Sequence, residues 1–249
     1  MSFANEQFLY VLILFGMIVI IPYLVLCFAP LKVLEPWKSV VSKDKSIIRP
    51  LLLSLSTLAI IYGVFLLGSL VKFQQDLPTW YLVLSVPMVI FIHDAYFYWT
   101  HYLMHKSKFL YRFHKHHHQS GDTTPLDAFA FHPVEAFIHF IFFVIYPVII
   151  PTSLEIMQFM FLWMLICNSA GHLPYEFYPK FLYDFPIIRQ FNTATHHHMH
   201  HQYYNSNFSL YYNWWDRWMN TNQKSYFMRF QEVKEKTHSI LKKGLHPSG

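Results

Sequence analysis

Charged residues are scarce in this chain of 249 residues: Asp, Glu, Lys and Arg occupy 13% of the positions, against about 25% in soluble domains. Apolar residues make up 54% and aromatic residues 20%, which excludes a disordered or collagen-like protein. The 19 basic residues exceed the 14 acidic ones, but they lie between or after apolar runs and form no stripe on a soluble domain. We therefore expect no nucleic-acid partner, and an anionic membrane surface as the counterpart of the positive charge.

Cysteine is nearly absent as well. Cys27 and Cys167 lie in separate apolar runs, which excludes a disulfide framework and a thiolate metal site. The chain also has no internal repeat and no glycine-rich phosphate loop before a helix. Histidine, by contrast, is abundant: its 17 residues outnumber the acidic residues, and most lie in four short clusters. We expect the chemistry there.

Long uncharged or nearly uncharged runs predict membrane helices at residues 8–29, 50–71, 80–92, 133–150 and 154–170. A helix of about 20 apolar residues crosses a hydrocarbon core of about 30 Å. No basic residue precedes the first run, so we expect an uncleaved anchor instead of a signal peptide. Pro151 separates the last two runs and predicts a helical hairpin. The expected fold class is all-α, with about four to five spans including this hairpin.

The loop at 30–49 is rich in lysine, whereas residues 72–79 carry one basic residue. The positive-inside rule places the first of these loops in the cytoplasm. Counting spans forward then places every histidine cluster on the cytoplasmic side. We expect a two-span region at 1–79 and a catalytic domain at 80–249, in which a cytoplasmic helical cap follows the hairpin at 133–170.

Histidine spacing predicts a metal site. An H-x3-H pair places two imidazoles on one helical face, and in each H-x2-HH motif we expect the first and fourth residues to share a face, with the fifth beside them. Nine imidazoles exceed the capacity of one metal with about four to six ligands, so two metals are predicted. Ligation by nitrogen alone suits Fe, Cu, Ni or Zn and argues against Mg and Ca. The nine candidate ligands are His101, His105, His114, His117, His118, His172, His197, His200 and His201.

Other polar residues near these motifs receive weaker assignments. Asp94 lies seven residues before His101, where it is expected to accept a hydrogen bond from an imidazole and fix its tautomer. His93 is either a ligand or a structural histidine, and its place nearer the apolar core favours the second. The middle residues His116 and His198 could substitute for their neighbours. No role is assigned to His139, His238 and His246, and a haem is disfavoured because the motifs lie at or beyond span ends.

Five segments together resemble a known superfamily: HDAYFYWTH, HKHHHQS, AFAFHPVE, NSAGH and NSNFSLYYNWWDRWMNT. In this order after apolar spans, they resemble the fatty acid hydroxylase and sterol desaturase superfamily of integral membrane non-haem di-iron enzymes, over roughly residues 85–222. Tyr102, Ser209 and the pair Met219-Asn220 depart from the superfamily pattern. These departures affect loop or supporting positions and leave the histidines intact.

The resemblance implies a membrane-bound di-iron oxygenase that hydroxylates or desaturates a lipid with O2. It implies two iron ions held by the nine histidines, with zinc able to occupy the same sites on overexpression. Asp94, Asn207 and Asp216 are the expected supporting residues. The chain contains no flavin or nicotinamide motif, Fe–S cysteine set or cytochrome b5 domain. We therefore expect a separate electron-transfer protein, such as a cytochrome b5-like protein or a ferredoxin with its reductase.

Several alternatives stay open at this point. The reaction is hydroxylation, desaturation or ether-lipid cleavage of the alkylglycerol monooxygenase type, and the lipid is a sterol, fatty acyl chain, carotenoid or alkylglycerol. The membrane is the bacterial inner membrane or the endoplasmic reticulum. From a different class, a histidine-rich metal transporter or metal-binding protein needs ligands midway along its spans, whereas these motifs lie at one side.

Overall fold

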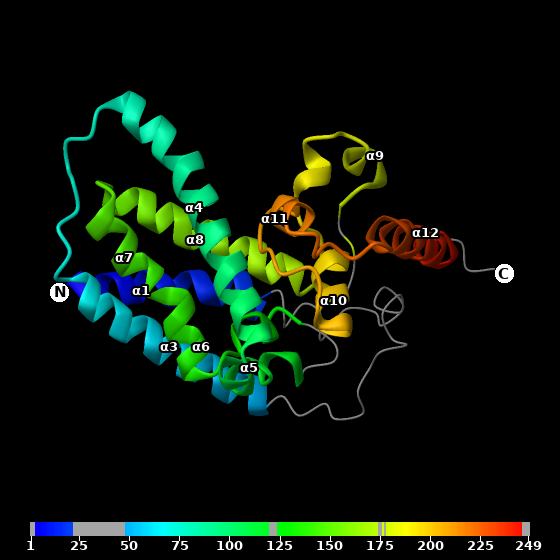
Figure 1. Cartoon of the computed structure of the whole chain (residues 1–249), viewed down its shortest axis with the longest axis horizontal. Helices are drawn as coiled ribbons and strands as arrows, with labels where there is room; N and C mark the ends of the chain where they lie inside the picture. The colour runs from blue at the N-terminus through cyan, green and yellow to red at the C-terminus, as the bar shows by residue number, and fades with distance from the viewer. Residues whose placement is uncertain (1–2, 22–47, 120–123, 174–175, 177, 246–249) are drawn as a thin grey trace.

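The computed structural model describes residues 3–21, 48–119, 124–173, 176 and 178–245. Within these ranges the chain is helical and has no β-strand, only one isolated antiparallel bridge between Phe191 and Tyr212. The all-α expectation is confirmed for this part of the chain (Figure 1).

The described α-helices range from four residues in α9 to 28 residues in α4. In chain order they are α1 (Phe3–Phe15), the π-helical η1 (Gly16–Ile20), α3 (Ile48–Gly68), α4 (Thr79–Lys106), α5 (Lys108–His114), the 3-10 turns η3 (His117–Gln119) and η4 (Asp127–Phe129), α6 (Pro133–Phe140), α7 (Phe142–Ile149), α8 (Leu154–Gly171), α9 (Lys180–Tyr183), the 3-10 turn η5 (Ile188–Gln190), α10 (Ala194–Tyr203), α11 (Trp214–Trp218) and α12 (Tyr226–Leu245).

Three of these helices, α3, α4 and α8, are long and apolar enough to cross a membrane. They contain the expected spans at 50–71, 80–92 and 154–170 over most of their lengths. Two further apolar helices are shorter, Ala4–Ile20 and Pro133–Ile149. They correspond to the first span and to the first arm of the hairpin, and the rest of the first span, from residue 22, lies outside the described residues, as does most of the loop at 30–49.

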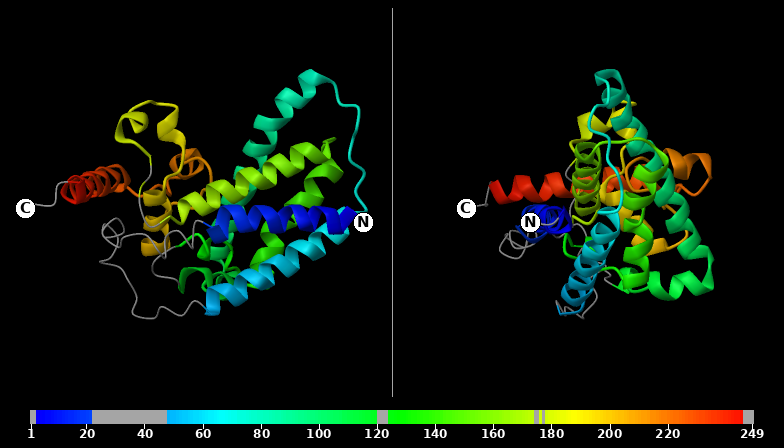
Figure 2. Two further views of the ribbon diagram at one scale, coloured as in Figure 1. Left: turned by 180° about the vertical axis from the view of Figure 1, so that it is seen from behind. Right: turned by 90° about the vertical axis from the view of Figure 1, so that its left-hand side faces the viewer.

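Contacts at the two ends of the bundle fix the direction of each helix. At one end, the Tyr81 hydroxyl donates to the Pro151 carbonyl at 2.6 Å. At the other end, Ser54 at the start of α3 donates to the Leu126 carbonyl at 3.2 Å, and Asn168 near the end of α8 donates to the Ala128 carbonyl at 2.5 Å. The C-terminal ends of α4 and α8 therefore lie at the same end as the start of α3, which we call the histidine end (Figure 2).

The helices of the bundle share one apolar core and present apolar residues outward. Val19, Val89 and Met160 are fully buried, each on a different helix of the core. Leu52 and Val83 are 60% and 65% exposed on α3 and α4, as expected for side chains that face lipid. Residues of α1 and α3 belong to the same core as those of α4 and α8. The division of the chain into two regions at residue 79 stays a prediction from the sequence.

The segments after α8 gather at the histidine end (Figure 1). Thr193 caps the start of α10, where its side chain accepts a hydrogen bond from the His196 amide at 3.2 Å, and Tyr204 caps the end with a left-handed backbone, φ of 60°. Its residues from Ala194 to His201 are all buried. The histidine motif on α10, His197, His200 and His201, is therefore enclosed between the bundle and the segments that follow it.

Candidate metal centre

Five histidines converge at the histidine end to form what we call the five-histidine cluster: His101, His105, His114, His118 and His200. They come from α4, α5, η3 and α10, and one nitrogen of each lies within 4.8 Å of one nitrogen of every other. The Nε2 atom of His114 is 3.1 Å from that of His101 and 2.9 Å from those of His105 and His118. His105 is half-buried and the other four are buried.

A second group, the four-histidine cluster, consists of His117, His172, His197 and His201, all buried. The Nε2 atom of His197 is 3.1 Å from that of His172 and 3.0 Å from that of His201. The two clusters are neighbours, because the rings of His118 and His201 have centroids 4.6 Å apart. Together they contain all nine histidines singled out by spacing.

The H-x2-HH motifs divide between the clusters in a way that the spacing argument did not foresee. In α10, His197 and His201 share the four-histidine cluster while His200 joins the other. Residues i and i+4 of this helix therefore share a face, whereas we expected the first and fourth residues to do so. In the earlier motif His114 ends α5, and the chain turns before η3. His118 thereby reaches the cluster of His114, and His117 enters the other.

Hydrogen bonds at Nδ1 determine the tautomer of four histidines. The Nδ1 atom of His101 lies 2.7 Å from the Phe208 carbonyl, that of His200 2.7 Å from the Ser206 carbonyl, and that of His172 2.9 Å from the Asn168 carbonyl. A carbonyl only accepts hydrogen bonds, so Nδ1 carries the proton in each ring. The Nδ1 atom of His114 lies 2.6 Å from a Glu135 carboxylate oxygen. Each of these rings therefore presents the lone pair of Nε2 to its cluster.

This arrangement fits bound metal ions. The Nε2 lone pairs of His101 and His114, which are 3.1 Å apart, repel unless a cation lies between them. Protonation is opposed, because burial, reinforced by neighbouring histidines, lowers the pKa of His114, His118 and His200 well below its ordinary value. Nitrogens about 2.1 Å from one metal and at right angles to each other are about 3.0 Å apart. The imidazole set also matches the donors that Fe, Cu, Ni and Zn accept.

Comparison with known proteins assigns the chain to a family. Residues 86–221 match the model of the fatty acid hydroxylase family, a range that includes all nine histidines. The chain belongs to the fatty acid hydroxylase family.

The curated relatives that the chain resembles include a lathosterol oxidase and sterol desaturases. The chain is 30% identical to human lathosterol oxidase over 136 residues, which are 55% of this chain and 44% of the relative. It is 29% identical to the Delta(7)-sterol 5(6)-desaturase of Leptosphaeria maculans over 142 residues, 55% of this chain and 36% of the relative.

A third relative, the very-long-chain aldehyde decarbonylase of Arabidopsis thaliana, is 27% identical over 192 residues, 72% of this chain and 30% of that protein. The matches thus span about a third to less than half of the length of these relatives. No solved structure matches the chain.

Asp94 lies on α4 as expected, but its hydrogen-bond partners are not histidines. Its carboxylate accepts hydrogen bonds from the Tyr211 amide at 2.9 Å and the Trp214 indole at 3.1 Å. Although Asp94 is on the same helix as His101, the Phe208 carbonyl, and not Asp94, accepts the imidazole hydrogen bond. The expectation that Asp94 fixes a histidine tautomer is therefore wrong, and its contacts attach the segment at 211–214 to α4.

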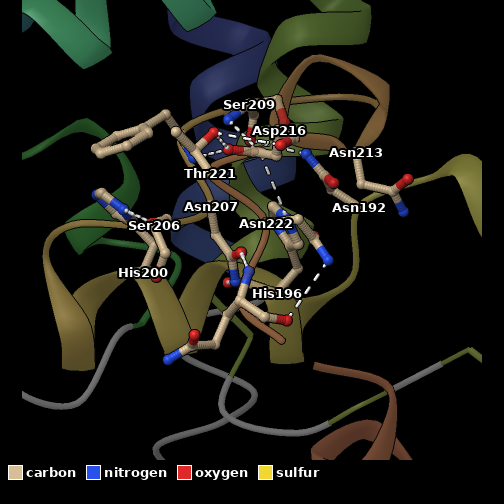
Figure 3. A network of polar contacts seen from close by, with 12 residues as sticks. Asn192, His196, His200, Ser206, Asn207, Ser209, Asn213, Asp216, Thr221 and Asn222 are labelled. Carbon is tan, nitrogen blue, oxygen red and sulfur yellow. Dashed lines mark hydrogen bonds and ion pairs between the residues drawn. The ribbon is translucent and has the colours of Figure 1, made fainter. Parts of the chain in front are cut away.

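Asp216 organises the loop that supplies these carbonyl groups (Figure 3). Its carboxylate accepts hydrogen bonds from the Phe208 amide at 2.7 Å, the Ser209 amide at 2.9 Å and the Thr221 hydroxyl at 2.7 Å, and also from the Ser209 hydroxyl. It is fully buried, and His196 Nε2 lies 3.6 Å away. Since Phe208 carries the carbonyl that meets His101, Asp216 supports the five-histidine cluster through the backbone.

Asn207 fixes the same loop from its other side. Its side-chain amide donates to the His196 carbonyl at 3.0 Å, and its side-chain oxygen accepts from the Gln223 amide at 2.7 Å. Its backbone is left-handed, with φ of 61°, a conformation that asparagine tolerates better than most residues. Asn207 thereby connects α10 to the loop between Ser206 and Phe208, whose carbonyls meet His200 and His101.

Sequence reasoning missed Glu135 and His196. Glu135 is fully buried at the start of α6, where His132 caps the helix and Pro133 occupies its first turn. A carboxylate inside an apolar run was the available signal, because such a group needs a partner. His196 is buried beside Asp216, and nothing in its spacing distinguished it from its neighbours.

The remaining described histidines are structural or near the surface. His93 hydrogen-bonds through Nδ1 to the Tyr211 hydroxyl at 2.9 Å and meets Phe142 edge-on, so the structural interpretation holds. His139 stacks on Phe97. His116 lies 2.8 Å from Arg49, and His198 hydrogen-bonds to the Leu173 carbonyl at 3.0 Å. The side chain of His238 and all of His246 lie outside the described residues.

Proposed function

We propose that this chain is a membrane-bound non-haem di-iron oxygenase that hydroxylates or desaturates a lipid, with O2 as co-substrate and electrons from a separate protein. The observation that carries this proposal is the pair of adjacent, buried, all-imidazole clusters at one end of apolar helices. One cluster has five donors and the other four, which suits two metal ions with positions left for O2. Iron bound there would supply the redox chemistry of O2 reduction and C–H oxidation.

The protein's own residues hold the ligand set and keep water out. The carbonyls of Ser206 and Phe208 and the carboxylate of Glu135 hold the Nδ1 protons of His200, His101 and His114. Each Nε2 therefore stays unprotonated and oriented toward its metal. In our proposal Asp216 and Asn207 act one step further out, by fixing the loop that carries the two carbonyls. Burial of the rings keeps bulk water away from the space in which the metal ions would be held.

A lipid is the substrate class that the surroundings favour. The clusters lie at the ends of α4 and α8, whose outer surfaces are apolar, so a bilayer lipid reaches them without crossing water. Relatives named for sterol desaturation and lathosterol oxidation support a sterol, whereas the aldehyde decarbonylase relative acts on a long chain. Hydroxylation is the simplest outcome of C–H oxidation, and desaturation or ether-lipid cleavage begins with the same hydrogen abstraction. We place the clusters on the cytoplasmic side, where a cytochrome b5-like protein or a ferredoxin delivers electrons.

The proposal is tested with purified protein in nanodiscs that is freed of metal, reconstituted anaerobically with Fe(II), and then given O2, a reductant and a lipid extract. We expect iron-dependent O2 consumption and lipids heavier by one oxygen or lighter by two hydrogens. The His197→Ala variant is the matched control. Oxidation that proceeds equally in this variant, or in zinc-loaded protein, would contradict the proposal.

A further inference from the structure

A cavity of about 210 Å³ lies between the C-terminal half of α8 and two later segments, residues 191–193 and 209–211. Trp163, Cys167 and Ala170 line it on the α8 side, at spacings of four and three residues that place them on one helical face. Phe191 and Leu210 line it on the opposite side. The cavity is therefore built across the boundary between the membrane bundle and the segments after it.

The cavity connects the lipid-facing surface with the metal centre. Ile166 lines it and is 45% exposed on α8, a helix long and apolar enough to span a membrane. His197 of the four-histidine cluster lines it as well. Gly171 leaves room at this inner boundary, because a Cβ atom there would lie 3.5 Å from the Cβ and Cγ atoms of His197.

Most of the polar groups in the lining are engaged within the protein, although among the described residues the buried Trp163 Nε1 and Asn192 Oδ1 have no hydrogen-bond partner. Asn168 donates to the Ala128 carbonyl, Asn192 donates to the Ser209 carbonyl at 2.7 Å, and the Thr193 and Tyr226 hydroxyls are 3.1 Å apart. The Ser209 hydroxyl donates to Asp216. What the cavity presents to a ligand is thus mainly the apolar surface of Trp163, Phe191 and Leu210, which suits hydrocarbon better than a charged headgroup.

The volume limits how much of a ligand fits. Sites that enclose most of a drug-sized ligand measure about 300–1,000 Å³, so a cavity of about 210 Å³ encloses only part of a membrane lipid. The rest stays outside the protein, and its natural place is the bilayer next to α8.

We propose that this cavity receives the hydrocarbon part of a lipid, which enters sideways from the bilayer past Ile166 and rests beside His197 while its headgroup stays at the membrane surface. The inference rests on the proposed oxygenase function and adds where the substrate's hydrocarbon lies. It also assigns specificity to the α8 face at Trp163, Cys167 and Ala170, since side-chain size there sets the width of the lipid that fits.

Photo-crosslinking tests this assignment without turnover. Zinc-loaded protein in nanodiscs is irradiated with a palmitate probe that carries a diazirine at mid-chain or with a sterol probe that carries one on its ring system, and adducts are mapped by mass spectrometry. We expect adducts on residues 163–171 and 209–211 with at least one probe, and the probe that reacts identifies the chain or ring class. Cys167→Phe, which fills the cavity, should lower these adducts about tenfold, equivalent to about 1.4 kcal/mol of binding. Cys167→Ala, the matched control, should not.

Metal content of both variants shows whether they are folded, and Ala170→Leu provides a second filling variant if Cys167→Phe loses metal. Adducts confined to other lipid-facing helices, or cavity adducts that neither filling variant reduces, would overturn the assignment. Cavity adducts in a protein that consumes no O2 would support the lipid site and refute the oxygenase. Lipid oxidation without cavity adducts would do the reverse.

Discussion

The two histidine clusters differ in how their rings are held. In the five-histidine cluster, His101 and His114 meet groups that lie 107 and 21 residues away along the chain, the Phe208 carbonyl and the Glu135 carboxylate, and His200 meets the Ser206 carbonyl. In the four-histidine cluster, His172 meets a carbonyl of its own helix, that of Asn168. Among the described residues, no group accepts a hydrogen bond from Nδ1 of His117 or His201, and in the five-histidine cluster the same holds for His118.

The five-histidine cluster therefore depends on contacts from distant parts of the chain at His101 and His114, whereas His172 and His197 of the four-histidine cluster depend on the packing of α8 against α10. Disturbing the loop at 205–223 or the start of α6 should therefore weaken one metal site and leave the other nearly unchanged.

Replacing one ligand histidine in each cluster should separate the two metal sites most clearly. His200 and His201 are adjacent, yet they belong to different clusters. We expect His200→Ala and His201→Ala each to lose about one metal per chain and all activity, and the double variant to lose both metals, because a ligand histidine cannot be replaced by a methyl group. Inductively coupled plasma mass spectrometry on purified protein checks this. Two retained metals in either single variant would contradict the assignment of that ligand.

Glu135 should produce the next largest effect. In a His201→Ala background, where only the five-histidine cluster keeps all its ligands, Glu135→Ala is expected to lower metal affinity about 10- to 100-fold, since it removes the partner that orients His114. Glu135→Gln should lower it less, because an amide oxygen still accepts the Nδ1 hydrogen bond. Competition with a chromogenic chelator measures both affinities. In a His200→Ala background, the same substitutions should leave the four-histidine cluster almost unaffected.

Asp216→Asn should act more weakly and through the loop. Replacing a carboxylate that accepts two backbone amides and two hydroxyls should destabilise the protein by about 1–3 kcal/mol. It should also lower metal affinity at the five-histidine cluster preferentially. Thr221→Val, which removes one of these hydrogen bonds, is the milder comparison and should cost about 0.5–1.5 kcal/mol. Thermal unfolding of metal-free protein and chelator competition provide the two readouts, and equal loss at both clusters would show that the loop does not favour one of them.

The smallest effect concerns pH. Burial lowers the pKa of His198 from 6.5 to about 4, so the folded protein keeps this ring neutral where the unfolded chain takes up a proton. The stability of metal-free protein should therefore be complete above pH 6.5 and fall as the pH drops toward 4, by at most about 1.4 kcal/mol per pH unit for one such histidine. His198→Gln should reduce the slope of melting temperature against pH. An unchanged slope would mean that His198 does not contribute.

Much of the metal centre was predictable because local spacing carries it. His101 and His105 are one helical turn apart, and four-residue spacing also joins His197 to His201, so helix geometry alone brings ligand pairs together. The apolar runs that became α3, α4 and α8 were equally visible, because span length is a local property. The division of each H-x2-HH motif was not predictable in this way, since it depends on where α5 ends and how α10 packs.

The supporting residues depend on contacts between distant parts of the chain, which spacing does not reveal. Asp94 and His101 lie on the same face of α4, but the loop at 205–223 provides the hydrogen-bond partners of both. The Phe208 carbonyl accepts from the His101 imidazole, and the Tyr211 amide donates to the Asp94 carboxylate. Asn207 and Asp216 entered only through family resemblance. Glu135 could have been suspected as a buried carboxylate, but its partner His114 lies on another element.

The most direct test of the central claim is an anaerobic titration of metal-free wild-type protein with Fe(II), followed by metal content per folded chain after desalting. Two separate imidazole clusters predict saturation near two iron ions per chain, with His200→Ala and His201→Ala each saturating near one. Saturation at one ion or none in a well-folded wild-type sample would contradict the account, because the nine histidines would then not form two metal sites.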